Sequence, residues 1–182
     1  MSGKLIVLFG PSGVGIGEIA ERIFAEREDV VPVVPVTARK MKDGERDGVG
    51  FFFFELEEWN AMKASGELIE TTEFAGNDYG TSRRLIEERF AEGRSVLIER
   101  EKDRAAQIKR NMPEALCVYV EPSPAVLEQR LRLISRSERE LALRLQTAAR
   151  MRAEADFCDL RVNSDDYSAA VAAIGRLLDC AE

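Results

Sequence analysis

Short apolar runs alternate with amphipathic segments along most of the 182 residues, which is typical of an α/β protein. Four runs rich in apolar and β-branched residues predict strands at 4–9, 95–100, 115–120 and 158–163. A fifth run, at 30–36, contains two prolines, which favours an edge strand or an interrupted one. Helical spacing of apolar residues predicts helices at 17–28, 82–92, 102–111, 124–133, 138–155 and 167–180.

Residues 37–81 break this alternation and predict a strand-rich lobe inserted into the α/β core. They contain the polar stretch "KDGERDG", the apolar run "FFFFEL", a short predicted helix at 57–64 and the alternating run "ELIETTEF". A second irregular polar insert, "LISRSE" at 133–138, lies between two arginine-rich helices. Since no repeat or long linker divides the chain, we expect a single domain.

Composition narrows the classes of function. The net charge of −7 argues against general nucleic-acid binding, which needs a basic face. The absence of histidine excludes histidine acid–base catalysis and histidine metal ligands. Cys117, Cys158 and Cys180 lie far apart, which favours free thiols in a reducing compartment. With no export signal and no apolar run of membrane-spanning length, we expect a cytoplasmic protein that binds neither membranes nor nucleic acid.

A glycine-rich loop follows the first predicted strand and opens the first predicted helix. It reads "GPSGVGIGE" and comprises Gly10, Pro11, Ser12, Gly13, Val14, Gly15, Ile16, Gly17 and Glu18. Such a turn presents backbone N–H groups to an anion at the positive end of the helix dipole. The strand–loop–helix context therefore predicts a phosphate-binding loop, the alternative being a plain turn between a strand and a helix.

Two residues of this loop are unsuited to ATP. The complete motif continues with lysine, which bridges the β- and γ-phosphates, and with a hydroxyl residue that holds Mg²⁺. Here the continuation is Ile16, Gly17 and Glu18. Glycine after the lysine position is tolerated where threonine follows it, so Glu18 stands where that hydroxyl would be. The carboxylate of Glu18 either repels the phosphates or points to solvent in the first helical turn, where it is favourable. We predict a loop that can hold an anion but binds ATP poorly.

With its downstream motifs, the chain resembles the guanylate kinase family over almost its full length. The loop, "PVTARKMKDGERDGVGFFFF" at 35–54 and "GELIETTEFAGNDYGTS" at 66–82 follow the family pattern in order and spacing. The resemblance implies a P-loop nucleoside monophosphate kinase fold, in which helices flank a parallel core sheet. It also implies a core of 1–36 and 82–182, a GMP-binding lobe at about 37–81 and a lid at about 133–138.

The same resemblance implies a set of GMP ligands within the inserted lobe. Arg39 and Lys42 match two phosphate-binding arginines, although lysine lacks the bidentate fork. Glu70 matches the carboxylate that accepts from guanine N1 and its exocyclic amine. Thr81 matches the hydroxyl that faces guanine O6, and Tyr79 matches a tyrosine that donates to the phosphate.

Other positions depart from the family pattern. Phe51 replaces a second phosphate-binding tyrosine, and Pro35 replaces the serine of active enzymes, as in scaffold proteins whose guanylate-kinase-like domains bind proteins. The lid motif is altered to "RLISRS", which leaves Arg132, Arg136 and Arg144 as candidate catalytic phosphate contacts. The alternative for these arginines is the solvated face of an amphipathic helix.

These features lead to a hypothesis and two alternatives. The first is a guanylate-kinase-like protein with lost or much reduced kinase activity, which binds GMP, another phosphorylated ligand or a protein partner. The second is an active guanylate kinase that converts ATP and GMP to ADP and GDP with Mg²⁺, in which a lid arginine or Lys40 replaces the missing lysine. The third, a kinase for another phosphorylated small molecule, fits the guanine-type ligands Glu70 and Thr81 less well. No metal ligand is predicted among the side chains.

Overall fold

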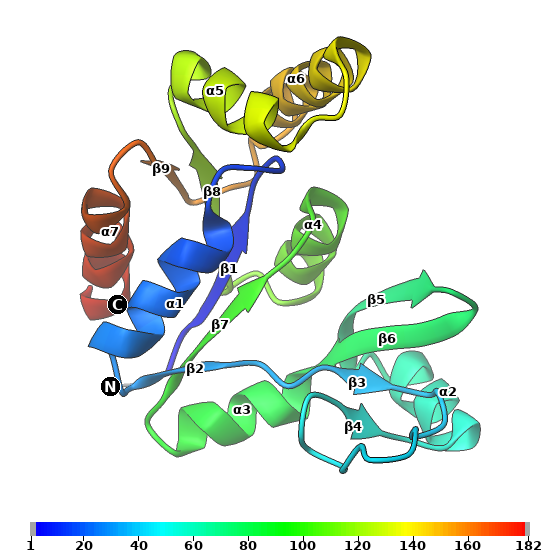
Figure 1. Ribbon diagram of the computed structural model, residues 1–182. Helices are drawn as coiled ribbons and strands as arrows, with labels where there is room; N and C mark the ends of the chain where they lie inside the picture. Colours follow the sequence, from blue (N-terminus) through cyan, green and yellow to red (C-terminus); the bar gives the residue numbers. More distant parts are fainter. Residues whose placement is uncertain (1–2, 181–182) are drawn as a thin grey trace.

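A five-stranded sheet forms the centre of the computed structural model, which describes residues 3–180 (Figure 1). The strand order is β2-β7-β1-β8-β9, and every neighbouring pair is parallel. The strands are β1 (Leu5–Phe9), β2 (Val30–Pro32), β7 (Ser95–Glu99), β8 (Leu116–Glu121) and β9 (Leu160–Asn163). The predicted α/β class with a parallel central sheet is therefore confirmed.

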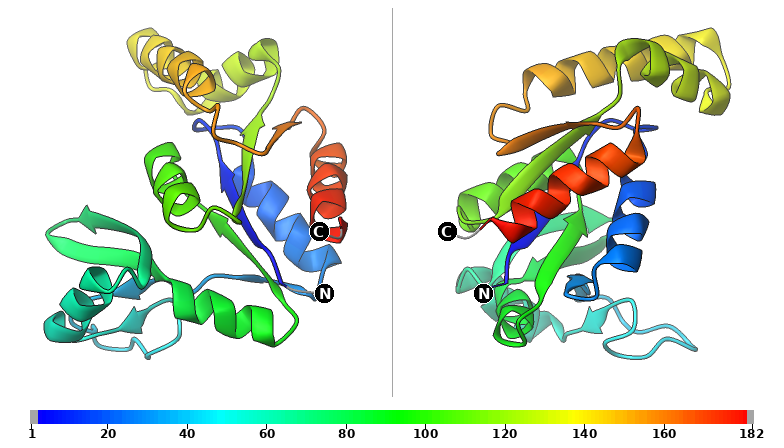
Figure 2. Two further views of the ribbon diagram at one scale, coloured as in Figure 1. Left: turned by 180° about the vertical axis from the view of Figure 1, so that it is seen from behind. Right: turned by 90° about the vertical axis from the view of Figure 1, so that its left-hand side faces the viewer.

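The apolar side chains of β1 explain why helices cover both faces of this sheet. Ile6 and Leu8 belong to a core cluster shared with α1 (Ile16–Glu26) and α7 (Tyr167–Asp179). Leu5, Val7 and Phe9 point to the opposite face, where buried residues of α4 (Lys102–Asn111) complete a second cluster. Figure 2 shows α1 and α7 on one side of the sheet and α4 on the other. Parallel strands covered in this way need apolar residues on both faces.

Residues 36–82 contain a second, smaller sheet with the strand order β4-β3-β6-β5 (Figure 1). Its elements are β3 (Val36–Thr37), β4 (Phe52–Phe53), α2 (Leu56–Ala64), β5 (Leu68–Phe74) and β6 (Asn77–Ser82). Trp59 of α2 is buried against Val36 and Leu68. The run at 30–36 is interrupted, as predicted: β2 lies at the edge of the central sheet, and β3 begins the small sheet. We call the four-stranded sheet β4-β3-β6-β5 the small sheet.

Three further helices frame the molecule. They are α3 (Arg83–Ala91), α5 (Pro124–Ile134) and α6 (Glu138–Ala153). In Figure 1, α5 and α6 lie at the top, across an open space from the small sheet. All predicted helices are present within two residues of their predicted ends, and the irregular insert at 133–138 spans the junction of α5 and α6. Among residues 3–180, no helix combines the length and apolar content that a membrane crossing requires.

Candidate functional site

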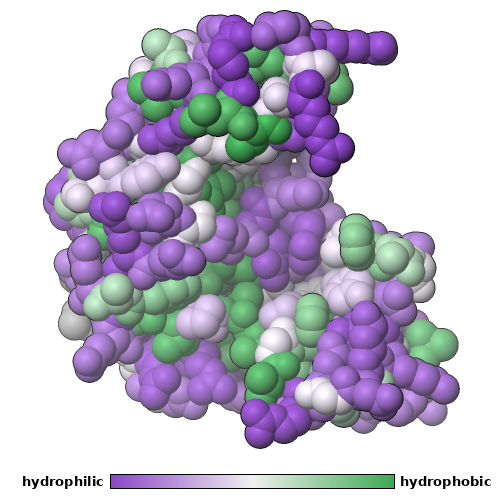
Figure 3. Space-filling model, viewed as in Figure 1, coloured by the Kyte–Doolittle hydropathy of each residue, from purple (hydrophilic) through white to green (hydrophobic). Residues whose placement is uncertain are grey.

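An open cleft of about 800 Å³ lies between the glycine-rich loop and the small sheet (Figure 3). Seven predicted site residues line it: Gly10, Ile16, Pro35, Arg39, Lys42, Phe51 and Tyr79. The wall between them includes four charged residues that follow or end β7: Glu99, Arg100, Glu101 and Arg104. Ligands of open α/β sheets bind beyond the carboxyl ends of the strands, so this cleft is the candidate site.

The backbone of the loop has the geometry that anion binding requires. Gly13 and Gly15 have φ values of 80° and 88°, and Gly15 is the N-cap of α1. Val14 between them is buried, and its carbonyl oxygen accepts hydrogen bonds from Ser164 Oγ (2.8 Å) and Arg130 Nη1 (3.0 Å). These contacts hold the loop from behind, while the N-terminus of α1 carries the positive end of its dipole.

The two unusual residues of the loop are engaged elsewhere. Ile16 packs at the edge of the core cluster beneath α1 and supplies no charge to the cleft. Glu18 Oε1 accepts hydrogen bonds from Arg22 Nε and Nη2, both at 3.0 Å. The side chains of Glu18 and Arg22 are both more than 40% exposed. Of the two arrangements that the sequence allowed for Glu18, the structure therefore has the one that faces solvent. The repulsion of a bound phosphate by Glu18 is thereby reduced by a neighbouring positive charge.

Of the three predicted lid arginines, one contacts the loop. Arg144 of α6 donates from Nη1 to Ser12 Oγ at 3.0 Å, while Nη2 and Nε bind Glu140. Arg132 instead bridges Glu128 and Glu138 at the surface. Arg136 is exposed, and its backbone N–H donates to Glu140. The structure thus brings a guanidinium from α6 to Ser12 of the loop, whereas Ile16 lines the cleft without a charge.

At the other end of the cleft, Arg39 is held by an acid and by aromatic rings. Its Nη1 and Nη2 donate to the two oxygens of Glu45 at 2.7 and 2.6 Å. The guanidinium carbon lies 5.2 Å from the Phe51 ring centre and 5.1 Å from that of Phe53, a cation–π arrangement. The hydrogen bonds from Arg39, and then that from the Lys42 backbone N–H, lower the pKa of Glu45 to about 2. Arg39 is therefore fixed in orientation, with Lys42 and Tyr79 beside it on the cleft wall.

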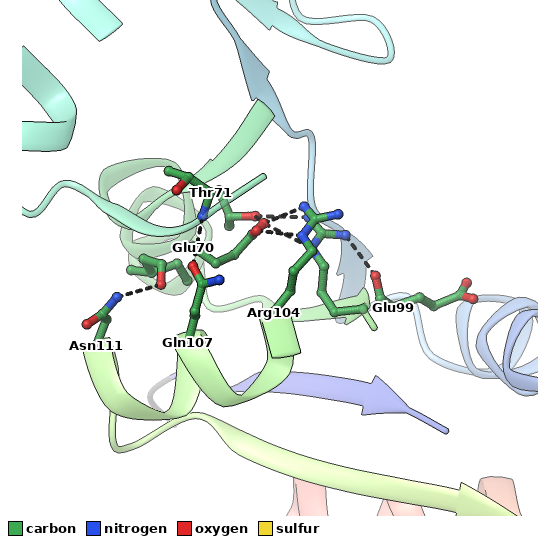
Figure 4. A network of polar contacts seen from close by, with 9 residues as sticks. Glu70, Thr71, Glu99, Arg104, Gln107 and Asn111 are labelled. Atoms are coloured by element: carbon green, nitrogen blue, oxygen red, sulfur yellow. Dashed lines mark hydrogen bonds and ion pairs between the residues drawn. The ribbon is translucent and has the colours of Figure 1, made fainter. Parts of the chain in front are cut away.

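Glu70 is buried on β5 at the centre of a polar network (Figure 4). Its Oε1 accepts from Thr81 Oγ1 (2.6 Å), Arg104 Nη2 (2.8 Å) and Arg100 Nε (3.0 Å), and its Oε2 accepts from Arg104 Nε (2.7 Å). Burial alone would raise the pKa of Glu70, but the hydrogen bond from Arg104, the charge of Arg100 and the hydrogen bond from Thr81 hold it below its usual value. Neither Glu70 nor Thr81 lines the cleft.

Known proteins are similar to this chain over nearly its whole length. The sequence profile of the guanylate kinase family matches residues 2–181. The chain is 38% identical to the guanylate kinase of Trichormus variabilis over 175 residues, which cover 95% of this chain and 88% of that protein. The chain belongs to the guanylate kinase family. It is also 36% identical to the guanylate kinase of Enterococcus faecalis over 173 residues, 93% of this chain and 84% of that one.

A solved structure of the family has the same fold. The crystal structure of guanylate kinase from Anaplasma phagocytophilum superposes with a TM-score of 0.63 and 26% sequence identity. The match covers 98% of this chain and 85% of that chain. The family resemblance derived from the motifs is therefore confirmed, whereas the roles of the individual site residues stay predictions.

The magnesium ion used by kinases of this fold does not fit the loop position where a hydroxyl would bind it. That position is Glu18, whose carboxylate is occupied by Arg22. Among residues 3–180, no group of three or more acidic, cysteine or histidine side chains forms a metal cluster. Since Mg²⁺ keeps several waters and binds largely through substrate phosphates, we assign no step to a residue that holds it.

Sequence reasoning missed Arg100 and Arg104, which lie against Glu70. They belong to the stretch "REKDRAAQ" at 100–107, where charged residues at helical spacing predict only a solvated face. The signal that could have found them is position, because both follow β7, at the carboxyl edge of a central parallel strand. Their partner was not visible locally, because Glu70 lies 30 and 34 residues earlier in the chain.

Proposed function

We propose that this protein is a phosphotransferase of the guanylate kinase family, with a weakened ATP side, that transfers phosphate from ATP to a nucleoside monophosphate. The names of its relatives indicate GMP as the acceptor. The observation that carries the proposal is the 3.0 Å contact between Arg144 Nη1 and Ser12 Oγ. It brings a positive charge to Ser12 of a loop whose lysine position carries Ile16.

In this proposal the chain acts by positioning and by charge. Backbone N–H groups of the loop and the guanidinium of Arg144 hold the phosphates of ATP. Arg39, Lys42 and Tyr79 hold the acceptor's phosphate with one oxygen toward the γ-phosphorus. That oxygen forms the new P–O bond while the bond to the ADP oxygen breaks, so a diphosphate and ADP result. Phosphoryl transfer depends mainly on such positioned charge and needs no covalent residue.

A second function is favoured by the chemistry of Ile16 and Glu18. If Arg144 does not compensate for the missing lysine, the protein binds a phosphorylated ligand without transferring phosphate. The arrangement of Arg39, Lys42 and Tyr79 supports binding in either case. A protein ligand that carries a phosphorylated side chain belongs to this second function.

A coupled assay for ADP release separates the two functions. ATP is supplied with each of several nucleoside monophosphates, and the unmodified protein is compared with Arg144→Ala and with Arg139→Ala, a matched control on an exposed position of the same helix. We expect measurable transfer by the unmodified protein and by the control, and a rate about 10²–10³-fold lower in Arg144→Ala. The absence of transfer with every acceptor, together with binding of a nucleoside monophosphate in calorimetry, would establish the second function instead.

A further inference from the structure

The wall of the cleft beyond Arg39 carries two guanidiniums among exposed or loop-facing acidic residues. Glu70, the carboxylate expected to read guanine, has both oxygens occupied by Thr81, Arg100 and Arg104, and its side chain is 0% exposed. Arg100 and Arg104 are 12% and 22% exposed and line the cleft in its place. In Figure 4, Arg104 extends from α4 to Glu70, and of these two residues it is the arginine that lines the cleft.

With arginines in place of the expected carboxylate, this part of the wall presents hydrogen-bond donors instead of an acceptor. An ionised carboxylate only accepts hydrogen bonds, whereas a guanidinium only donates them. Guanine presents an N1–H and an exocyclic amine on this edge, and these groups are donors as well. Donors that face donors in a partly buried site leave hydrogen bonds unmade, and each unsatisfied group weakens binding.

The charge of this network also favours a ligand with hydrogen-bond acceptors or negative charge. One carboxylate, Glu70, lies between two guanidiniums, so this trio carries one excess positive charge. Burial lowers the pKa of Arg100 to about 10, against the opposing effect of Glu70, so it remains charged at neutral pH. Arg104 Nη1 makes no hydrogen bond to any residue in the range 3–180, which leaves a charged donor available at the cleft wall.

The acidic residues of the same cleft do not occupy that donor. Glu99 extends toward the loop, where its Oε2 lies 3.9 Å from the position that a Cβ on Gly17 would take. Glu73 and Glu101 are exposed and make no side-chain hydrogen bond to another residue of the described chain. Arg100 donates to Glu70, Thr81 and the backbone carbonyl of Glu99, so Nη1 of Arg104 is the donor that remains open to an acceptor group of a ligand.

We propose that this end of the cleft selects a phosphate ester whose far end carries hydrogen-bond acceptors or negative charge, and that it disfavours the donor edge of guanine. Among purine nucleotides, the class that fits is a 2-oxopurine nucleoside monophosphate. Its 2-oxo oxygen replaces the exocyclic amine of guanine with an acceptor, directed at Arg104. The inference rests on the proposed function only in that the ligand's phosphate binds at Arg39 and Lys42.

Calorimetric titration of the unmodified protein with three nucleotides tests the inference directly. GMP carries an amine at C2, xanthosine 5′-monophosphate an oxygen at C2 together with a proton on N3, and inosine 5′-monophosphate a hydrogen at C2. We expect xanthosine monophosphate to bind at least about tenfold tighter than GMP, which corresponds to one unmade hydrogen bond of about 1.4 kcal/mol, with inosine monophosphate between them. Equal binding, or tighter binding of GMP, would overturn the inference.

Two variants then locate the preference. Arg104→Gln should reduce the ratio of the two affinities to within about threefold, because it removes the charged donor while Arg100 and Thr81 still hold Glu70. Arg110→Gln, on an exposed position of the same helix, should leave the ratio unchanged. A ratio that Arg104→Gln does not alter would also overturn the inference.

The outcomes separate this inference from the proposed function. If GMP binds at least as tightly as the 2-oxo nucleotide, and Arg39→Ala abolishes that binding, the phosphate site is established and the selectivity is wrong. If none of the three nucleotides binds, the proposed function and the inference both fail. If the preference is found but no phosphate is transferred, the inference stands and the protein is a binding protein.

Discussion

The two ends of the cleft differ in where their positive charge comes from. The loop end has the backbone of a phosphate site but carries Ile16, and the guanidinium that contacts its Ser12 is Arg144, which belongs to another helix. The small-sheet end has Arg39 and Lys42, and the wall between adds Arg100 and Arg104. One end has lost a charged group, while the other retains two and is bordered by two more.

This difference shows that the backbone of the loop and the side chains that would bind ATP are subject to separate physical constraints. A Cβ on Gly10 would lie 2.3 Å from the Val120 carbonyl oxygen, and one on Gly15 would lie 2.3 Å from the Tyr167 hydroxyl. These contacts require glycine whether or not a phosphate binds. Ile16 lies between the core edge and the cleft, and Glu18 faces solvent, so neither position requires glycine. The glycine pattern therefore identifies the fold better than it identifies ATP as a ligand.

The largest effect is expected at the buried acid of the small-sheet end. Glu70→Ala should lower the free energy of unfolding by about 3–5 kcal/mol, because it leaves Arg100 and Arg104 without the charge that offsets their burial. Urea denaturation at neutral pH measures this change. Glu73→Ala, an exposed position on the same strand, is the control and should change the stability by less than about 0.5 kcal/mol. Equal stability of the two variants would show that the network contributes nothing.

The next effect tests the loop end. Ile16→Lys should raise the rate of phosphate transfer by about 10²–10³-fold, because it places a charged donor at the phosphates in the transition state. The long aliphatic stem of lysine can keep the packing of Ile16 against the core while its ammonium reaches the cleft. Single-turnover measurements with ATP and the preferred acceptor report the rate, with Ile16→Met as the apolar control. A rate no higher than that of the control would mean that the missing charge does not limit transfer.

The sequence predicted the central sheet well, because its strands are short apolar runs whose character is local. The boundary in the run at 30–36 was also readable, since Pro32 and Pro35 prevent continuous pairing. The site was predicted less completely. Arg39, Lys42 and Tyr79 were found through the family motif, and they line the cleft. The occupation of Glu70 by two arginines could not be predicted, because it depends on the contact of β5 with the chain after β7.

A smaller effect concerns ligand affinity at Arg39. Arg39→Ala should weaken binding of the preferred nucleoside monophosphate by about 10–150-fold, the equivalent of one charge-assisted hydrogen bond of about 1.5–3 kcal/mol. Calorimetry provides the dissociation constants. Arg46→Ala, in the same connecting segment but not part of the cleft wall, should bind normally. Unchanged affinity in Arg39→Ala would show that the small-sheet end of the cleft is not the phosphate site.

The smallest effect concerns Glu45, which holds Arg39 in place at this end of the cleft. Arg39 is the main cause of the lowered pKa of Glu45, about 2 against an ordinary value of 4.5. Because the folded pKa lies below the unfolded one, the stability that Glu45 contributes is fully present above about pH 4.5 and is lost as the pH falls toward 2. The contribution is small, because Glu45 is 27% exposed and the pair is partly screened by water.

Comparing the unmodified protein with Glu45→Gln isolates this contribution. The two urea midpoints should differ by a constant amount between about pH 7 and pH 5, and the difference should begin to narrow at about pH 4. Unfolding of the rest of the protein by acid affects both chains alike, since both retain Glu70 and its arginines. A difference that widens as the pH falls would mean that Glu45 is protonated more readily in the folded protein than in the unfolded one. In that case the carboxylate would not fix Arg39, and the small-sheet end would lack the held guanidinium on which the comparison of the two ends depends.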